Sequence, residues 1–142
     1  MCSSDLLAGT DATRQCQPAR PVAVLHIHAR DDDHVRYNGG AGEAAFRDLS
    51  KVMDFVSVPQ TLARWRERLH CPQQAVSVLK APGAQCELRQ PCDGGTALQL
   101  CVTDEGGHSW PGSAGGRWGK AKPSQALNAT DEIWRFFVAH PR

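Results

Sequence analysis

The stretch Cys101-Val102-Thr103-Asp104-Glu105-Gly106-Gly107-His108-Ser109-Trp110-Pro111-Gly112 decides how the rest of this chain is interpreted. An apolar, strand-like run at Leu98, Leu100 and Val102 leads into two glycines, a histidine and a turn-forming Trp-Pro-Gly. An open α/β sheet carries its chemistry just outside the carboxyl ends of its strands, where this histidine is expected. A single histidine in a glycine loop is more often an ordinary surface residue. The interpretation therefore depends on a second loop of the same kind.

That second loop follows the first firm element of the chain. Residues 21–28 are a near-continuous apolar run, which is typical of a strand buried on both faces in a parallel sheet. The run continues into a polar turn that holds three consecutive aspartates, Asp31, Asp32 and Asp33, and closes with two glycines.

Composition limits the possible classes of protein. A chain of 142 residues with 41% hydrophobic and 22% charged residues is one globular domain at most. A net charge of +1 without a basic stripe argues against nucleic acid, and no apolar run reaches transmembrane length. Six cysteines indicate an oxidising compartment, although residues 1–7 are no signal peptide. We therefore expect a secreted parent protein with a missing N-terminus, and interpret residues 1–7 as a non-native leader outside the fold.

The remaining elements predict an α/β fold. Ser57 and Pro59 suit the start of a helix over residues 57–70, in which four apolar residues form one stripe: Val58, Leu62, Trp65 and Leu69. Trp65 is expected in the core. A short strand is expected at 76–79, two strands at 86–89 and 97–102 around an Asp93-Gly94 turn, and a last helix from Asn128 to His140. The order is strand, acidic loop, helix, hairpin strand, histidine loop, helix.

The cysteines allow two disulfides. Counting outward from the Asp93-Gly94 turn sets Cys86 opposite Cys101, so a cross-strand bridge is geometrically possible. The same count makes this a hydrogen-bonded pair with wider-set side chains, which argues somewhat against the bridge. Cys71 and Cys92 are the other natural partners, and Cys16 is left free or paired with a residue outside this chain.

An acid after one strand and a histidine after a later strand match the second half of a hydrolase triad. In α/β-hydrolases the order along the chain is nucleophile, acid, histidine. The ionised acid orients the imidazole and stabilises its protonated form, while the histidine takes the proton of the nucleophile.

Residues 28–40 resemble the acid loop of the extracellular polyhydroxybutyrate depolymerase and feruloyl esterase family, roughly His-Gly-x-x-Asp-x-x-Val-x-Tyr. Residues 106–112 resemble its histidine loop, residues 128–137 its closing helix, and residues 58–71 the helix that ends in the family's cysteine. The resemblance covers about residues 16 to 142, and Ala29 replaces the usual glycine.

The resemblance implies a catalytic acid at Asp32 and a catalytic base at His108, with Asp31 and Asp33 as turn residues. Trp110 is a candidate substrate contact. The implied fold for residues 8–142 is the C-terminal part of an α/β-hydrolase domain, with the last parallel strands, a hairpin and flanking helices. The implied substrate is an ester, either a polyester or a feruloylated polysaccharide, and no cofactor is implied.

The nucleophile half is missing from this sequence. No Gly-x-Ser-x-Gly occurs, and Ser113, in Pro-Gly-Ser-Ala-Gly-Gly, follows the histidine instead of preceding the acid. We expect the chain to be a fragment that is inactive alone.

Two other classes of protein are alternatives to the esterase interpretation. A metal-dependent hydrolase would use His26, His28, the aspartates 31–33 and His34, because histidines two apart on a strand point to the same face. The spacing does not match a His-x-His-x-Asp-His motif. A non-catalytic module held by disulfides would explain the cysteines but leave the paired loops unexplained.

Overall fold

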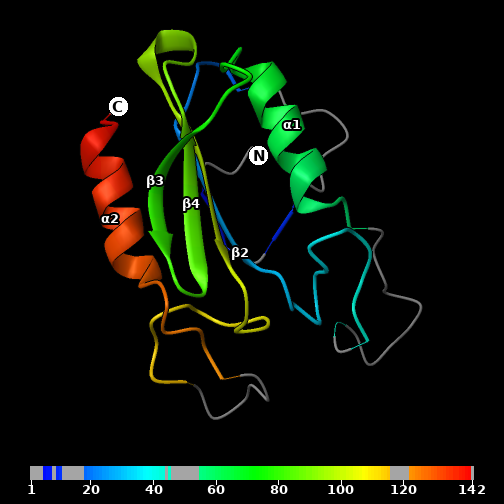
Figure 1. Cartoon of the computed structure of the whole chain (residues 1–142). Coiled ribbons are helices and arrows are strands. Elements are labelled where there is room, and N and C mark those ends of the chain that lie inside the picture. The colour runs from blue at the N-terminus through cyan, green and yellow to red at the C-terminus, as the bar shows by residue number, and fades with distance from the viewer. Residues whose placement is uncertain are drawn as a thin grey trace.

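The computed structural model describes residues 5–7, 9–10, 18–43, 45, 55–115 and 122–141. Within them, five strands form one mixed sheet in the order β1-β2-β5-β4-β3, with two α-helices beside it (Figure 1). The elements are β1 (Asp5–Leu7), β2 (Val24–Ala29), α1 (Val58–Arg68), β3 (Val76–Ala81), β4 (Ala84–Arg89), β5 (Leu98–Thr103) and α2 (Ala129–Ala139). The architecture is α/β, as expected, and the finer assignment to an α/β-hydrolase fold stays a prediction. None of the helices in these ranges is long and apolar enough to cross a membrane.

Strands β2 and β5 are the centre of the sheet. They pair in parallel over their whole length, from Val24 opposite Leu98 to Ala29 opposite Thr103. Every residue of β2 is buried, which confirms the prediction of a strand covered on both faces. Because the two strands run in the same direction, the loops that follow them leave the same edge of the sheet.

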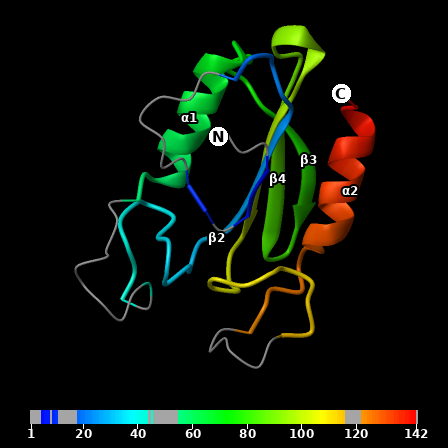
Figure 2. The same cartoon turned by 180° about the vertical axis from the view of Figure 1, so that it is seen from behind.

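The two helices cover opposite faces of the sheet, as the front and back views show (Figures 1 and 2). Alternate residues of β2 separate accordingly, because Val24 packs with α1 while Leu25 and Ile27 pack on the side of α2. The α1 side contains Val58, Leu62, Trp65, Leu69, Cys92 and Leu98, and the α2 side contains Ala84, Cys86, Ala97, Cys101, Leu127, Ala129 and Phe136. Trp65 is 2% exposed, which confirms its place in the core.

Local sequence signals begin both helices. The Ser57 side chain accepts a hydrogen bond from the Gln60 backbone N–H, and the Gln60 side chain accepts one from the Ser57 backbone N–H, so a capping box starts α1. Asn128 caps α2 through the backbone of Asp131, as expected. The predicted helix ends were within one or two residues of the observed ones.

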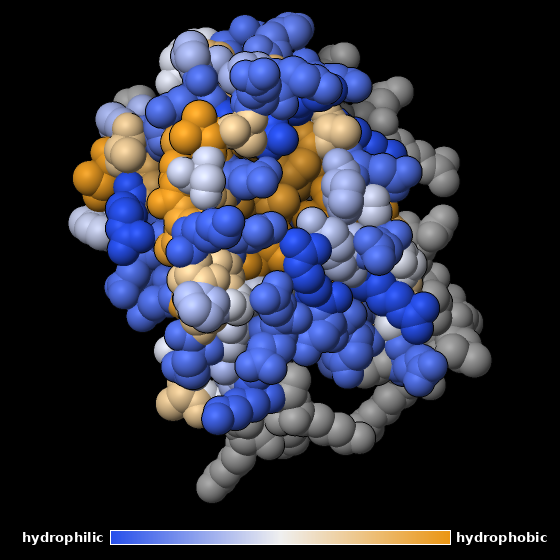
Figure 3. Space-filling view, viewed as in Figure 1, coloured by the Kyte–Doolittle hydropathy of each residue, from blue (hydrophilic) through white to orange (hydrophobic). Residues whose placement is uncertain are grey.

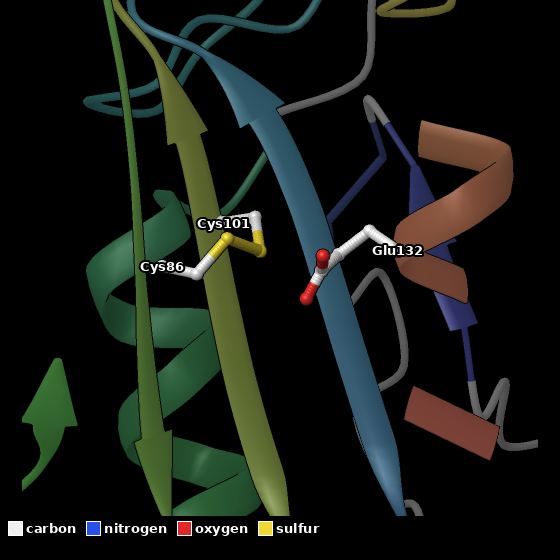
Figure 4. A group of neighbouring side chains, drawn as sticks. All are labelled: Cys86, Cys101 and Glu132. Carbon is white, nitrogen blue, oxygen red and sulfur yellow. A yellow bond between two sulfur atoms is a disulfide. The ribbon is translucent and has the colours of Figure 1, made fainter. Parts of the chain in front are cut away.

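The cross-strand disulfide between Cys86 and Cys101 is formed (Figure 4). Its Cα atoms are 4.1 Å apart, the narrow spacing of a non-hydrogen-bonded pair. The parity argument against this bridge was therefore wrong. It assumed a regular two-residue turn, whereas a 3-10 helix at Asp93–Gly95 and further loop residues separate the strands.

The second disulfide joins Cys71 to Cys92 and ties the end of α1 to the loop between β4 and β5. Cys16 lies outside the described residues. Glu132 approaches the first disulfide from α2, and Figure 4 shows the three side chains together. Both sulfur atoms belong to the bridge, so this group offers no thiolate to a metal ion.

Two ends of the sheet differ from the expectation. Residues 1–7 were set aside from the fold, yet Asp5–Leu7 form β1, which pairs in parallel with β2 from Leu25 to Ile27. The exclusion was wrong for these three residues, because three residues are too few to show a periodic pattern. Their non-native origin stays a prediction. At the other edge, β3 continues to Ala81, beyond the expected residue 79, and carries a bulge near Ser77.

Candidate active site

The acid loop and the histidine loop meet just beyond the carboxyl ends of β2 and β5. The Arg30 backbone N–H donates to Thr103 O at 2.9 Å, which continues the pairing one residue past β2. Just beyond, Asp32 Oδ2 lies 3.0 Å from His108 Nδ1, although the residues are 76 positions apart. This geometry confirms the expected proximity, while the catalytic roles of both residues stay predictions.

The carboxylate of Asp32 is fixed by its own loop. Its side chain is fully buried, and Oδ1 accepts hydrogen bonds from the backbone N–H groups of His34 at 2.8 Å and Val35 at 2.9 Å. Burial alone would raise the pKa of Asp32, but the hydrogen bonds from His108, Val35 and His34 outweigh it and lower the pKa below its usual value. Asp32 is therefore held ionised.

His108 is positioned to accept a proton. An ionised carboxylate only accepts hydrogen bonds, so Nδ1 carries the hydrogen in the Asp32–His108 bond, and Nε2 of the neutral ring keeps its lone pair. The side chain is 39% exposed. The hydrogen bond to Asp32 raises the pKa of His108, burial opposes this rise, and the charges of Asp32 and Asp33 add to it.

Two buried histidines lie behind the acid. His28 Nε2 donates to Val35 O at 2.8 Å and lies 3.5 Å from Asp32 Oδ2. His28 Nδ1 then accepts from His26 Nε2 at 3.3 Å. Burial, with the nearby His28 ring, lowers the pKa of His26 to about 3, and burial likewise lowers the pKa of His28. Both rings are therefore neutral, which leaves His108 as the histidine beside Asp32 that can become a cation.

The ligands of the metal-site alternative are only partly brought together. Ligand atoms of Asp32, Asp33 and His34 lie within 4.8 Å of one another. Among the described residues, no group of three or more possible metal ligands at such distances includes His26 or His28. Asp33 Oδ1 is 2.7 Å from His34 Nδ1, so two of the three groups already bind each other. This arrangement offers less to a metal ion than the sequence alternative assumed.

The flanking aspartates bind groups other than His108 Nδ1. Asp33 binds His34, and Asp31 binds the backbone N–H groups of Gly106 and Gly107. Sequence reasoning missed these contacts of Asp31. It also missed the stacking of His34 on His108, whose ring centroids are 4.8 Å apart with an interplanar angle of 23°. Spacing within the loop carries no signal for either contact.

Trp110 and Ser113 lie in the turn after His108. The Trp110 indole N–H donates to Thr130 Oγ1 at 3.1 Å, which holds the ring against the start of α2 with 43% of the residue exposed. Its role as a substrate contact stays a prediction. Ser113 binds Trp110 O and Gln125 through its backbone.

Gly112 lets this turn approach α2. A Cβ at Gly112 would lie 2.7 Å from the Cα of Asn128, so the close packing requires glycine. The Ala129 N–H donates to Pro111 O at 3.0 Å across the same contact. The Trp-Pro-Gly sequence thus fixes the histidine loop to the helix that follows it.

A cavity of about 640 Å³ opens beside the acid loop. Asp32 lines it but His108 does not, and its other lining residues are mostly charged or polar: Arg30, Asp31, Asp33, Arg36, Tyr37, Asn38 and Glu43. This cavity therefore does not define an acyl pocket around the histidine.

Comparison with known proteins supports an esterase-like relationship. No family model matches the chain. A stretch of 95 residues is 30% identical to feruloyl esterase B of Piromyces equi. That stretch is 67% of this chain and 17% of the relative, so the chain corresponds to a minor part of the relative's length.

Proposed function

We propose that this chain carries the acid and the base of a serine-type carboxylic-ester hydrolase. Asp32 is the triad acid and His108 the triad base. The observation that carries the proposal is the 3.0 Å contact between Asp32 Oδ2 and His108 Nδ1 at the carboxyl ends of adjacent parallel strands. The similarity to an esterase supports the same chemistry.

In the proposed reaction, His108 Nε2 takes the proton of a serine hydroxyl as the oxygen attacks the ester carbonyl. Asp32 stays ionised and stabilises the imidazolium that results. The proton then passes to the departing alcohol, and His108 activates the water that hydrolyses the acyl-enzyme. The proposal requires the serine and the oxyanion hole to be supplied by another segment, because no Gly-x-Ser-x-Gly occurs in these 142 residues.

The proposed substrate is a polyester or a feruloylated polysaccharide, and the name of the relative favours a feruloyl ester. The proposed reaction needs no cofactor and no nucleic-acid partner. Two disulfides within the described residues are consistent with a secreted parent protein.

A chimeric enzyme tests the proposal. A segment of the Piromyces equi esterase that includes the matched region is replaced by residues 22–141 of this chain, which hold both Asp32 and His108, and hydrolysis of methyl ferulate is measured. We expect activity in the chimera, and a loss of about 10³- to 10⁴-fold in kcat/KM for Asp32→Asn or His108→Gln. Asp33→Asn is the matched control and keeps most of the activity. Equal losses in Asp33→Asn and Asp32→Asn would contradict the assignment.

The chain alone provides the complementary test, because it lacks the serine. We expect no hydrolysis of an activated phenyl ester above buffer. Turnover that disappears in Ser113→Ala would place the nucleophile inside this chain, and turnover removed by a chelator would favour metal-dependent hydrolysis.

A further inference from the structure

Asp31 binds the histidine loop with both oxygens of its carboxylate. Oδ1 accepts a hydrogen bond from the Gly107 N–H at 2.8 Å, and Oδ2 accepts one from the Gly106 N–H at 3.2 Å. Bonds from two neutral donors to one ionised carboxylate are stronger than bonds between neutral groups. The contact crosses between loops that are 75 to 76 positions apart.

The histidine loop is shaped for this contact. Gly106 and Gly107 have φ angles of +130° and +57°, which favour glycine, and their successive N–H groups both donate to the Asp31 carboxylate. Both residues are buried, so their N–H groups need a partner. A Cβ at Gly106 would lie 2.8 Å from the backbone nitrogen of Ser124, so the loop cannot easily take a residue with a side chain here.

Successive residues of the acid loop bind successive parts of the histidine loop. Arg30 Nε lies 3.5 Å from Asp104 Oδ1. Asp31 is hydrogen-bonded to Gly106 and Gly107, and Asp32 is hydrogen-bonded to His108. The first contact is exposed at both side chains and therefore weak. The Asp31 contact ends at Gly107, directly before His108, so it fixes the backbone from which the imidazole extends.

We propose that Asp31 is the positioning residue of the site, which holds the backbone of the histidine loop so that the His108 ring reaches Asp32. Its catalytic meaning depends on the proposed function, but the contact itself does not. Asp32 is held separately by the N–H groups of His34 and Val35, so loss of Asp31 frees the backbone at Gly106 and Gly107 and leaves the acid in place.

We expect Asp31 to act on His108 by positioning the loop backbone and not through its charge. The charges that raise the pKa of His108 are those of Asp32 and Asp33. A variant of Asp33 therefore removes a nearby charge without removing a contact to the glycines. Asp33→Asn is therefore the matched control, because Asp33 follows Asp32 directly just as Asp31 precedes it.

Nuclear magnetic resonance on the full chain tests the proposal, with the His108 ring titrated and amide hydrogen exchange measured at Gly106 and Gly107. In Asp31→Ala we expect exchange at both glycines to accelerate by about 10- to 100-fold. We also expect the pKa of His108 to fall toward its usual value and the Nδ1 proton signal to weaken. Asp31→Asn keeps one acceptor oxygen and should protect one glycine. Asp33→Asn should lower the pKa of His108 through charge alone, with unchanged exchange at both glycines.

The proposal is overturned if exchange at the glycines is unchanged in Asp31→Ala and the pKa of His108 falls no further than in Asp33→Asn. If Asp31→Ala does not fold, the nearly isosteric Asp31→Asn decides by the same two readouts. Failure of the proposed function would show as an inactive chimera with an intact Asp31 contact. Failure of this inference would show as unchanged loop exchange whatever the activity of the chimera.

Discussion

His108 and Asp32 influence each other's protonation in opposite directions. Burial raises the pKa of Asp32, but hydrogen bonds outweigh it and lower the pKa, so the stability it adds is present above its usual pKa of 3.8 and is lost as the pH falls through the folded value. Its hydrogen bond to Asp32 raises the pKa of His108, so the stability from this group is present below 6.5 and is lost as the pH rises through the folded value. The charged pair therefore stabilises the fold most between these two limits.

The same shift sets the pH dependence of catalysis in the chimera. The base must be neutral, so kcat should rise with pH through a midpoint above 6.5, the usual pKa of histidine. Asp33→Asn removes a charge that raises the pKa of His108, and should move this midpoint to lower pH. A pH–rate profile of both proteins measures the shift. If the midpoint of the pH–rate profile is the same in the Asp33→Asn variant at low salt, the group that titrates is not His108.

His26 predicts a loss of stability in acid. Burial lowers its pKa to about 3, so below pH 6.5 the unfolded chain takes up a proton that the folded chain refuses. The free energy of unfolding should fall by up to about 1.4 kcal/mol per pH unit from this group alone. Urea unfolding at several pH values should show a shallower decline for His26→Gln. A decline in His26→Gln as steep as in the unchanged chain would show that other groups cause the loss of stability in acid.

At the scale of elements, one disulfide joins two strands of the sheet and the other joins the end of α1 to the loop between β4 and β5. Cys86 and Cys101 are 15 positions apart, and Cys71 and Cys92 are 21 positions apart. Replacing either pair by alanine should lower the free energy of unfolding by about 3 kcal/mol, as measured by urea unfolding.

Neither replacement touches the loops of the site, so the pKa of His108 should stay raised in both double variants. A fall in that pKa at a pH where the variant is still folded would show that the disulfides also shape the site. Comparison of the two double variants separates an effect at β4 and β5 from an effect at the end of α1.

The elements were largely predictable because their patterns are periodic. The buried run of β2, the stripe of α1 and the cap of Asn128 each predicted the observed element. The loop between β4 and β5 was predicted less well, because a turn signal at Asp93-Gly94 does not say whether the hairpin is regular. The strand β1 was missed because three residues carry too little pattern.

The candidate site was only partly predictable for a related reason. Two strand ends in one parallel sheet imply that their loops meet, and Asp32 and His108 do meet. Three adjacent aspartates are chemically identical, however, so residue chemistry alone did not select the middle one. The selection depends on which carboxylate the loop backbone turns toward the histidine, and on the N–H groups of His34 and Val35 that hold it there.

At the scale of the whole molecule, apolar side chains remain exposed. Val76 and Val78 on the edge strand β3 are 68% and 46% exposed, and Trp134 and Val138 of α2 are 74% and 60% exposed. Figure 3 shows hydrophobic residues at the surface between the two helices. An unpaired edge strand with exposed valines favours self-association.

A charge on this edge should reduce self-association. We expect Val78→Lys to increase the monomer fraction in size-exclusion chromatography and light scattering, because a lysine on an edge strand opposes pairing with another chain. Gln74→Lys adds the same charge just before β3 and is the control. Equal improvement in both variants would show that net charge, and not the strand edge, controls solubility.

The two disulfides have a topological consequence for cleavage of the backbone. Their spans overlap, because Cys86 lies between Cys71 and Cys92 while Cys101 lies beyond both. A single cut anywhere from residue 71 to residue 101 therefore leaves the two products covalently joined under non-reducing conditions. A single cut between residues 33 and 70 is different, since neither bridge crosses it. Such a cut would convert the acid and the histidine into parts of two separate polypeptides, held as one particle by the pairing of β2 with β5 and by the contacts between their loops.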